Sequence, residues 1–195
     1  MLEYERKNLE KGYKLIAGVD EVGRGPLAGP VVCCAVIMPL EELIEGVNDS
    51  KKLTEKKREK LAEIIKEKAI AYNIAQISQE EIDEINILNA VKKCMVNAVK
   101  GLKIAPDITL VDGVDTGLEI NAEYVIKGDA KSYNIACASI VAKVYRDRLM
   151  CENAIKYPNY HFEKHKGYGT KDHIEALKKY GKCPLHRDSF IGHFI

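Results

Sequence analysis

Two apolar, β-branched runs separated by a short turn stand within the first forty residues, and they set how the fold begins. The first run covers residues 14–20 (KLIAGVD) and the second covers residues 31–38 (VVCCAVIM). The segment between them, EVGRGPLAGP, is rich in glycine and proline, which is typical of a turn. Because strands joined by a short connection usually lie side by side, we predict an antiparallel hairpin.

Downstream of the hairpin, helix patterns and strand patterns alternate. Apolar residues spaced three and four apart indicate helices, and short β-branched runs indicate strands. Ser78 and Glu81 form a capping box at the start of one helix, and Gly181 is placed to end the last one. The predicted elements are, in chain order, a helix over 54–68, a strand over 71–77, a helix from 78 towards 102, strands over 108–112 and 122–128, and helices over 132–156 and 170–180.

This order of elements predicts an α/β fold with a mixed five-stranded sheet flanked by helices. The length of 195 residues fits a single domain over 1–195, with the C-terminal helical segment from about residue 157 packing on it. Binding sites in such sheets form beyond the strand ends, where the connections diverge.

The composition, with 46% hydrophobic and 30% charged residues, is that of a globular protein. No apolar run approaches the roughly 20 residues of a membrane span, and the charged N-terminus does not look like a secretory signal. The six cysteines lie mostly in apolar runs, without a C-x-x-C pair. We therefore expect reduced, buried cysteines and a cytoplasmic protein.

The formal net charge is only +1, which is low for a protein that binds phosphates. Lysine and arginine nevertheless cluster at 51–52, 56–58 and 164–166. Taken alone, each cluster is more typical of a solvated helix face or loop. Composition therefore neither establishes nor excludes a nucleic-acid partner.

Acidic residues fall where predicted strands end. Asp20 and Glu21 stand at the end of the first strand, Asp112 ends the fourth, and Asp129 follows the fifth. Any one of them alone could form an Asx-turn or a helix cap. Together, on neighbouring strands, they would bring several carboxylates to one end of the sheet.

Clustered carboxylates repel one another, so they must protonate, pair with cations or bind metal. Oxygen ligands without cysteine or histidine favour hard cations, which predicts Mg²⁺ or Mn²⁺. Two such ions about 3.5–4 Å apart suit phosphodiester hydrolysis. The adjacent Gly23, Arg24 and Gly25 form a tight turn, whose amides and guanidinium could also approach a sugar-phosphate.

At this point the sequence resembles ribonuclease HII over nearly the whole chain. The resemblance rests on ordered blocks: DEVGRGPLAGPV at 20–31, DSKKL at 49–53, DG at 112–113, KGD at 127–129, SIVAKVYRD at 139–147, and KGYGT at 166–170 with His173.

The resemblance implies a ribonuclease H-like fold in which Asp20, Glu21, Asp112 and Asp129 are the catalytic carboxylates that hold two divalent ions. It also implies that the enzyme cuts the RNA strand of RNA–DNA hybrids, including at single ribonucleotides in duplex DNA. The cut lies 5′ of the ribonucleotide and leaves 3′-hydroxyl and 5′-phosphate ends, as ribonucleotide excision repair requires.

The resemblance further implies a set of substrate contacts. The ribonucleotide and its 2′-hydroxyl would be recognised by the Gly23–Arg24–Gly25 turn, with Tyr168 packed on the sugar. Further candidates for substrate contact are Lys51, Ser139 and Lys143, although Lys143 is equally compatible with an ordinary helix face. Arg146, Asp147 and Arg187 are interpreted as structural, and we expect a monomer without a clamp-binding peptide.

Two other interpretations of these motifs compete with ribonuclease HII. Ribonuclease HIII replaces the arginine between the two glycines, so Arg24 favours ribonuclease HII. The other rival is a nucleic-acid-binding module that has lost catalysis. The full set of four carboxylates argues against it, because unused acidic groups would weaken a phosphate-binding surface.

Overall fold

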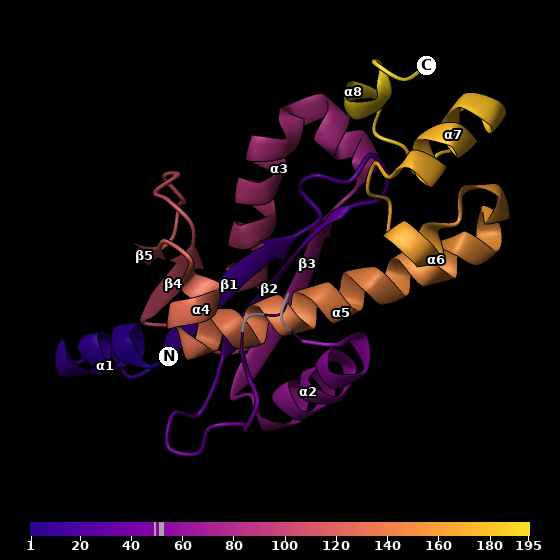
Figure 1. Cartoon of the computed structure of the whole chain (residues 1–195). Helices are drawn as coiled ribbons and strands as arrows, with labels where there is room; N and C mark the ends of the chain where they lie inside the picture. Colours follow the sequence, from indigo (N-terminus) through magenta and orange to yellow (C-terminus); the bar gives the residue numbers. More distant parts are fainter. Residues whose placement is uncertain (49, 51–52) are drawn as a thin grey trace.

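A five-stranded sheet forms the centre of the computed structural model, which describes residues 1–48, 50 and 53–195 (Figure 1). The strand order is β3-β2-β1-β4-β5. β1 pairs antiparallel with β2 and parallel with β4, so the predicted hairpin and mixed sheet are confirmed. The strands are β1 (Ile16–Val22), β2 (Val31–Ile37), β3 (Ala71–Ile77), β4 (Ile108–Asp112) and β5 (Ala122–Val125).

Helices cover both faces of the sheet. On one face α3 packs against β1, β2 and β3, and on the other face α5 and α2 lie side by side (Figure 1). The helices are α1 (Glu3–Glu10), α2 (Glu55–Lys68), α3 (Gln79–Lys100), α4 (Gly128–Lys131), α5 (Tyr133–Lys156), η2 (Pro158–Tyr160), α6 (Phe162–His165), α7 (Lys171–Tyr180) and α8 (Asp188–Ile191).

Strand alternation divides the core between these two faces. In β1, Ala17 and Val19 point towards α3, whereas Ile16 packs on the opposite side with Ile135 of α5. Gly18 lies directly under the start of α5, where an added Cβ would come within 2.3 Å of the Ile135 backbone nitrogen. Only glycine therefore lets α5 cross β1 this closely, and the same face of β1 leads on to Asp20.

The C-terminal segment packs around the far end of α5. Phe162, Leu185 and Ala28 share one buried cluster with Met150 of α5. This cluster holds the segment after residue 157 against the turn that joins β1 to β2. In the part of the chain that the structure describes, no helix combines the length and apolar character needed to cross a bilayer.

The strand ends differ from the prediction in two places that matter for the site. β1 continues to Val22, so Asp20 and Glu21 lie inside the strand instead of closing it. The fifth strand ends at Val125 and not at Gly128, because Lys127 adopts a left-handed conformation (φ 57°) from which α4 begins. Asp20 and Glu21 therefore lie within a paired strand, and Asp129 lies in α4.

Candidate active site

Two carboxylates stand next to each other where the parallel pairing of β1 with β4 ends. Val19 pairs with Val111, so Asp20 and Asp112 are the next residues along their strands. Asp20 is only 6% exposed. Its burial, followed by the nearby charges of Glu21 and Asp112, raises its pKa well above the ordinary value.

Two protein donors hold the Asp20 carboxylate in place. Its Oδ1 accepts the Glu21 backbone N–H at 2.7 Å, and the Ser139 hydroxyl donates to the same carboxylate. The Ser139 Oγ in turn lies 2.9 Å from the Ser50 Oγ. Either of these two hydroxyls can be the donor in that second bond.

Glu21 points to the other side of β1, because successive strand residues alternate. Burial raises its pKa, the Arg24 guanidinium opposes that rise, and Asp112 adds to it. The Arg24 Nη1 lies 3.4 Å from the Glu21 Oε1, while the Arg24 side chain is 57% exposed. Glu21 therefore belongs to the same electrostatic group as Asp20 and Asp112.

The fourth predicted carboxylate, Asp129, follows a residue whose backbone N–H is hydrogen-bonded to Asp112. The Gly128 N–H donates to the Asp112 Oδ1 at 2.6 Å, and Asp129 is the next residue, in the first turn of α4. A helix-cap role for Asp129 at the start of α5 is ruled out, since Ser132 caps that helix by accepting the Ile135 N–H. The Asp129 main chain therefore follows directly on the amide that donates to Asp112.

The ligand chemistry of this group fits a hard divalent cation. It consists of carboxylate oxygens, and the charges of Glu21 and Asp112 help to raise the pKa of Asp20, which is the condition a bound cation relieves. Among residues 1–48, 50 and 53–195, no three acidic, histidine or cysteine side chains are already arranged around a common metal position. Three of the carboxylates instead hold protein donors: the Glu21 amide, Arg24 and the Gly128 amide.

The turn between β1 and β2 is held by two buried arginines that the sequence indicated only as structural. Arg146 of α5 donates to the carbonyls of Pro30, Ala28 and Lys166 at 2.9–3.0 Å. Burial lowers the pKa of Arg146 to about 10. This arginine joins the β1–β2 turn to the segment that carries Tyr168.

Arg187 holds the other side of the same turn. It donates to the carbonyls of Gly23 and Gly29 at 2.7 Å and to that of Arg24 at 3.0 Å. Burial lowers the pKa of Arg187 to about 9. Its guanidinium lies over the Phe190 ring, 5.0 Å from the ring centroid. The conformation of the glycine-flanked turn is thus set by a residue from the C-terminal tail.

The predicted recognition residues come together on this turn. Arg24 and Gly25 are exposed, whereas Gly23 is buried. A Cβ on Gly25 would lie 3.8 Å from the Tyr168 Cε1, so the tyrosine ring stands beside the turn. The Leu27 N–H donates to the Gly167 carbonyl at 2.8 Å and fixes the two segments together. Tyr168 keeps 41% of its surface exposed.

The three further candidates for substrate contact, Lys51, Ser139 and Lys143, differ in their surroundings. The Lys143 Nζ lies 2.7 Å from the Asp147 Oδ1, one turn further along α5, so this lysine has an acidic partner within its own helix. Ser139 is buried against Asp20. Lys51 lies outside the described residues.

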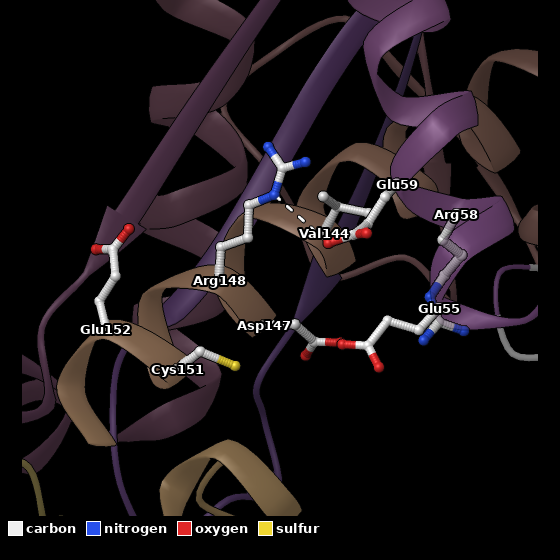
Figure 2. A pocket seen from close by; sticks show the side chains of 8 residues that line it. All are labelled: Glu55, Arg58, Glu59, Val144, Asp147, Arg148, Cys151 and Glu152. Carbon is white, nitrogen blue, oxygen red and sulfur yellow. Dashed lines mark ion pairs between the residues drawn. The ribbon is translucent and has the colours of Figure 1, made fainter. Parts of the chain in front are cut away.

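A pocket of about 290 Å³ lies between α2 and α5 and contains none of the predicted site residues (Figure 2). Figure 2 shows Arg148 directed at Glu59, an ion pair with a 3.8 Å separation. Arg58, on the same wall, donates to the carbonyls of Ser50 and Leu53. Arg58 thereby connects α2 to the main chain at Ser50 and Leu53.

Comparison with solved structures defines the class of protein. Ribonuclease H2 from Pyrococcus horikoshii OT3 superposes with a TM-score of 0.77 at 32% identity, covering 90% of this chain and 93% of that one. The ribonuclease HII of the Archaeoglobus fulgidus PCNA:RNase HII complex gives a TM-score of 0.76 at 28% identity, covering 90% and 94%. The fold is therefore ribonuclease H-like, and the protein belongs to the class of ribonucleases H.

Sequence comparison defines the family. The Ribonuclease HII family model matches residues 17–193. The ribonucleases HII of Acetivibrio thermocellus and Caldicellulosiruptor bescii are 58% and 59% identical to this chain. These alignments cover 100% and 99% of this chain and 77% and 94% of the relatives. The chain belongs to the ribonuclease HII family, as the motifs predicted, and is a nuclease of the hydrolase class.

Proposed function

We propose that this ribonuclease H cuts RNA–DNA hybrids and also duplex DNA that contains a single ribonucleotide. The cut falls on the 5′ side of the ribonucleotide and leaves 3′-hydroxyl and 5′-phosphate ends. The observation that carries the proposal is the placement of a mutually repelling carboxylate group at the base of the exposed turn that faces Tyr168.

The reaction depends on divalent cations in this proposal. Asp20, Glu21, Asp112 and Asp129 would hold Mg²⁺ or Mn²⁺, for which their oxygen ligands are suited. When bound, a pair of such ions activates the attacking water and stabilises the leaving oxygen. Ser139 and the Gly128 amide orient two of the carboxylates for that task.

Recognition of the ribonucleotide is assigned to the turn and to Tyr168. The 2′-hydroxyl is the group that distinguishes a ribonucleotide within DNA, and it both donates and accepts hydrogen bonds. Backbone groups at Gly23 and Gly25 can approach it closely because neither residue carries a side chain. Arg24 can reach a phosphate from its exposed position beside Glu21, and the Tyr168 ring packs on the sugar.

Three further residues are proposed to contact the substrate: Lys51, Ser139 and Lys143. For Lys143 this requires exchanging Asp147 for a phosphate, since the two side chains are paired at 2.7 Å. For Ser139 the hydrogen bond to Asp20 adds an orienting role to any contact with the strand.

We also propose a single-domain, monomeric enzyme of the cytoplasm with no clamp-binding peptide. The six cysteines are all free and five of them are buried, in keeping with a reducing compartment. The shared cluster of Phe162, Leu185, Ala28 and Met150 supports one domain, because it joins the C-terminal segment to α5 and the β1–β2 turn.

The catalytic assignment is tested by Asp112→Asn. This change keeps the shape of the side chain and its acceptor for the Gly128 N–H but removes the charge. We expect cleavage of a hybrid to be abolished while binding, measured by fluorescence anisotropy, is retained. The matched control is Asp115→Asn, an exposed residue three positions later that accepts the Gly117 N–H and should leave turnover unchanged. Wild-type turnover by Asp112→Asn would remove Asp112 from the site.

A further inference from the structure

Three buried histidines lie behind Tyr168, outside the carboxylate group and the β1–β2 turn. His165 ends α6, His173 lies in α7, and His186 stands between α7 and α8, all in the C-terminal segment (Figure 1). Their exposed fractions are 9%, 0% and 4%. The rings of His165 and His173 stack with their centroids 4.4 Å apart, and those of His173 and His186 lie 5.2 Å apart.

The hydrogen bonds of His173 determine which of its nitrogens carries the proton. Its Nδ1 lies 2.9 Å from the Tyr168 carbonyl oxygen, which can only accept, so Nδ1 must be protonated. Its Nε2 lies 3.1 Å from the His186 Nε2. One of these two nitrogens must donate and the other accept, and a neutral His173 supplies the acceptor.

The remaining bonds agree with that assignment. If the His186 Nε2–H donates to His173, the His186 Nδ1 must accept, and the Cys183 backbone N–H reaches it at 2.9 Å. In His165, Nε2 donates to the Tyr160 carbonyl at 2.8 Å, while Nδ1 accepts the Gly167 N–H at 3.2 Å. All three rings are therefore satisfied as neutral imidazoles, and each in one tautomer.

An added proton on any ring would break this arrangement. Protonated His173 would direct its Nε2–H at the N–H of His186, and protonated His165 would direct Nδ1–H at the Gly167 N–H. Burial opposes protonation as well: it lowers the pKa of His173 to about 4 and also lowers those of His165 and His186.

Charged and titratable groups on the neighbouring elements face this histidine group. Their effects on the histidine pKa values are smaller than that of burial. Around His165 and His186 they act in both directions, since acidic residues raise the histidine pKa values and basic residues lower them. The acidic groups are Glu163, Asp172 and Asp188, and the basic or titratable ones are His161, Lys182 and Cys183.

The histidine group holds the main chain on both sides of Tyr168. The Tyr168 N–H donates to the His165 carbonyl at 2.9 Å, and the Tyr168 carbonyl accepts from His173. The preceding Gly167 donates its N–H to His165 and accepts the Leu27 N–H. A shift of His173 would therefore move the Tyr168 ring relative to Gly25.

We propose that His173, supported by His186, is a positioning residue that fixes the Tyr168 main chain and thereby sets how strongly the enzyme prefers a single embedded ribonucleotide. This inference rests on the proposed contact between Tyr168 and the ribose. It differs from a general stabilising role, because the effect should appear in substrate choice and depend on Tyr168.

The test compares His173→Leu, which removes the donor to the Tyr168 carbonyl, with His173→Asn, which places an amide N–H near the Nδ1 position and cannot be protonated. The readout is the ratio of kcat/KM on a duplex with one ribonucleotide to kcat/KM on a continuous hybrid. Misplacing a binding group by about 1 Å can cost about a hundredfold. We expect His173→Leu to lower the ratio about tenfold or more, and His173→Asn to restore most of it.

A double-mutant cycle separates positioning from a general loss of structure. In a Tyr168→Ala background, His173→Leu should change the ratio no further, because both changes remove the same contact. The matched control is His161→Asn, at an exposed residue with a left-handed backbone that asparagine tolerates, and it should keep the wild-type ratio.

A second measurement does not depend on a variant that folds. Long-range ¹H–¹⁵N spectra of the wild-type protein at pH 6 should show neutral His173 in the Nδ1–H tautomer. A protonated His173, or the Nε2–H tautomer, would overturn the inference.

The outcomes also distinguish this inference from the proposed function. If the wild-type protein does not cut a duplex with one ribonucleotide, the proposed function fails whatever the histidines do. If the wild type cuts it and His173→Leu keeps the wild-type ratio, the inference alone fails. Additive losses in the cycle would likewise show that His173 does not act through Tyr168.

Discussion

Asp20→Asn should make the metal-free protein more stable while it destroys activity. The wild-type carboxylate is 6% exposed and lies beside Glu21 and Asp112, all of which raise its pKa. Asparagine has the same shape and keeps an acceptor for the Glu21 N–H. The substitution therefore removes a buried charge and leaves the packing unchanged.

The size of the gain follows from the spacing of the strands. Neighbouring strands lie about 4.8 Å apart, and two like charges about 5 Å apart repel by about 3 kcal/mol at an effective dielectric constant of 20. Relaxation of the side chains reduces this figure. We expect the free energy of unfolding to rise by about 2 kcal/mol at pH 7.5.

The gain should depend on pH and on metal in defined directions. A raised pKa in the folded state means that ionising Asp20 costs stability as the pH rises through that pKa, and that the cost is absent below the unfolded value of 3.8. The advantage of the variant should therefore disappear in acid. Saturating Mg²⁺ or Mn²⁺ should also reduce it, because a ligand at a hundred times its Kd stabilises the wild type by about 2.7 kcal/mol.

Urea unfolding followed by circular dichroism, with chelator present, measures this difference. The matched control is Asp107→Asn, because the Asp107 carboxylate accepts the N–H groups of Lys14 and Leu15 and its pKa is lowered. That control should lose stability where Asp20→Asn gains it. An Asp20→Asn protein no more stable than the wild type at pH 7.5 would refute the idea of a strained carboxylate group.

Two further predictions concern the C-terminal segment. Arg187→Met leaves the carbonyls of Gly23, Arg24 and Gly29 without their donor, so the free energy of unfolding should fall by about 3 kcal/mol or more. The exposed control Lys182→Met should change it by less than about 1 kcal/mol, and urea titrations measure both. Above pH 6.5 the neutral histidines contribute to the free energy of unfolding, and this contribution is lost as the pH falls towards the His173 pKa of about 4. Between pH 7 and pH 5, His173 alone should account for a loss of about 2 kcal/mol. Urea titrations at both pH values should then show a smaller loss for His173→Asn, and an equal loss would contradict the neutral assignment.

The sheet could be predicted because short stretches of sequence indicate each of its strands. The runs at 14–20 and 31–38 and the strand ending at Asp112 are rich in β-branched residues and lie near glycine or proline, and their order leaves few ways to pair them. The extra length of β1 could not be predicted, since Glu21 and Val22 continue the strand only because β2 pairs with them as far as Val32.

The support of the site could not be predicted from local patterns. Arg187 lies 164 residues from Gly23, and only the folded chain brings its guanidinium under the turn. The three histidines lie close together in the C-terminal segment, but they carry no spacing that distinguishes buried imidazoles from surface ones. The short helices α1, α6 and α8 also lack a periodic pattern long enough to indicate them.

The most direct test of this account is the position of the cut in a duplex with one ribonucleotide in an otherwise DNA strand. The wild-type protein with Mg²⁺ or Mn²⁺ should cut once, on the 5′ side of the ribonucleotide, and chelator should abolish the product. End-group analysis should find a 3′-hydroxyl and a 5′-phosphate. No cut in this duplex, together with cleavage of a continuous hybrid, would contradict the role given to the Gly23–Gly25 turn and Tyr168.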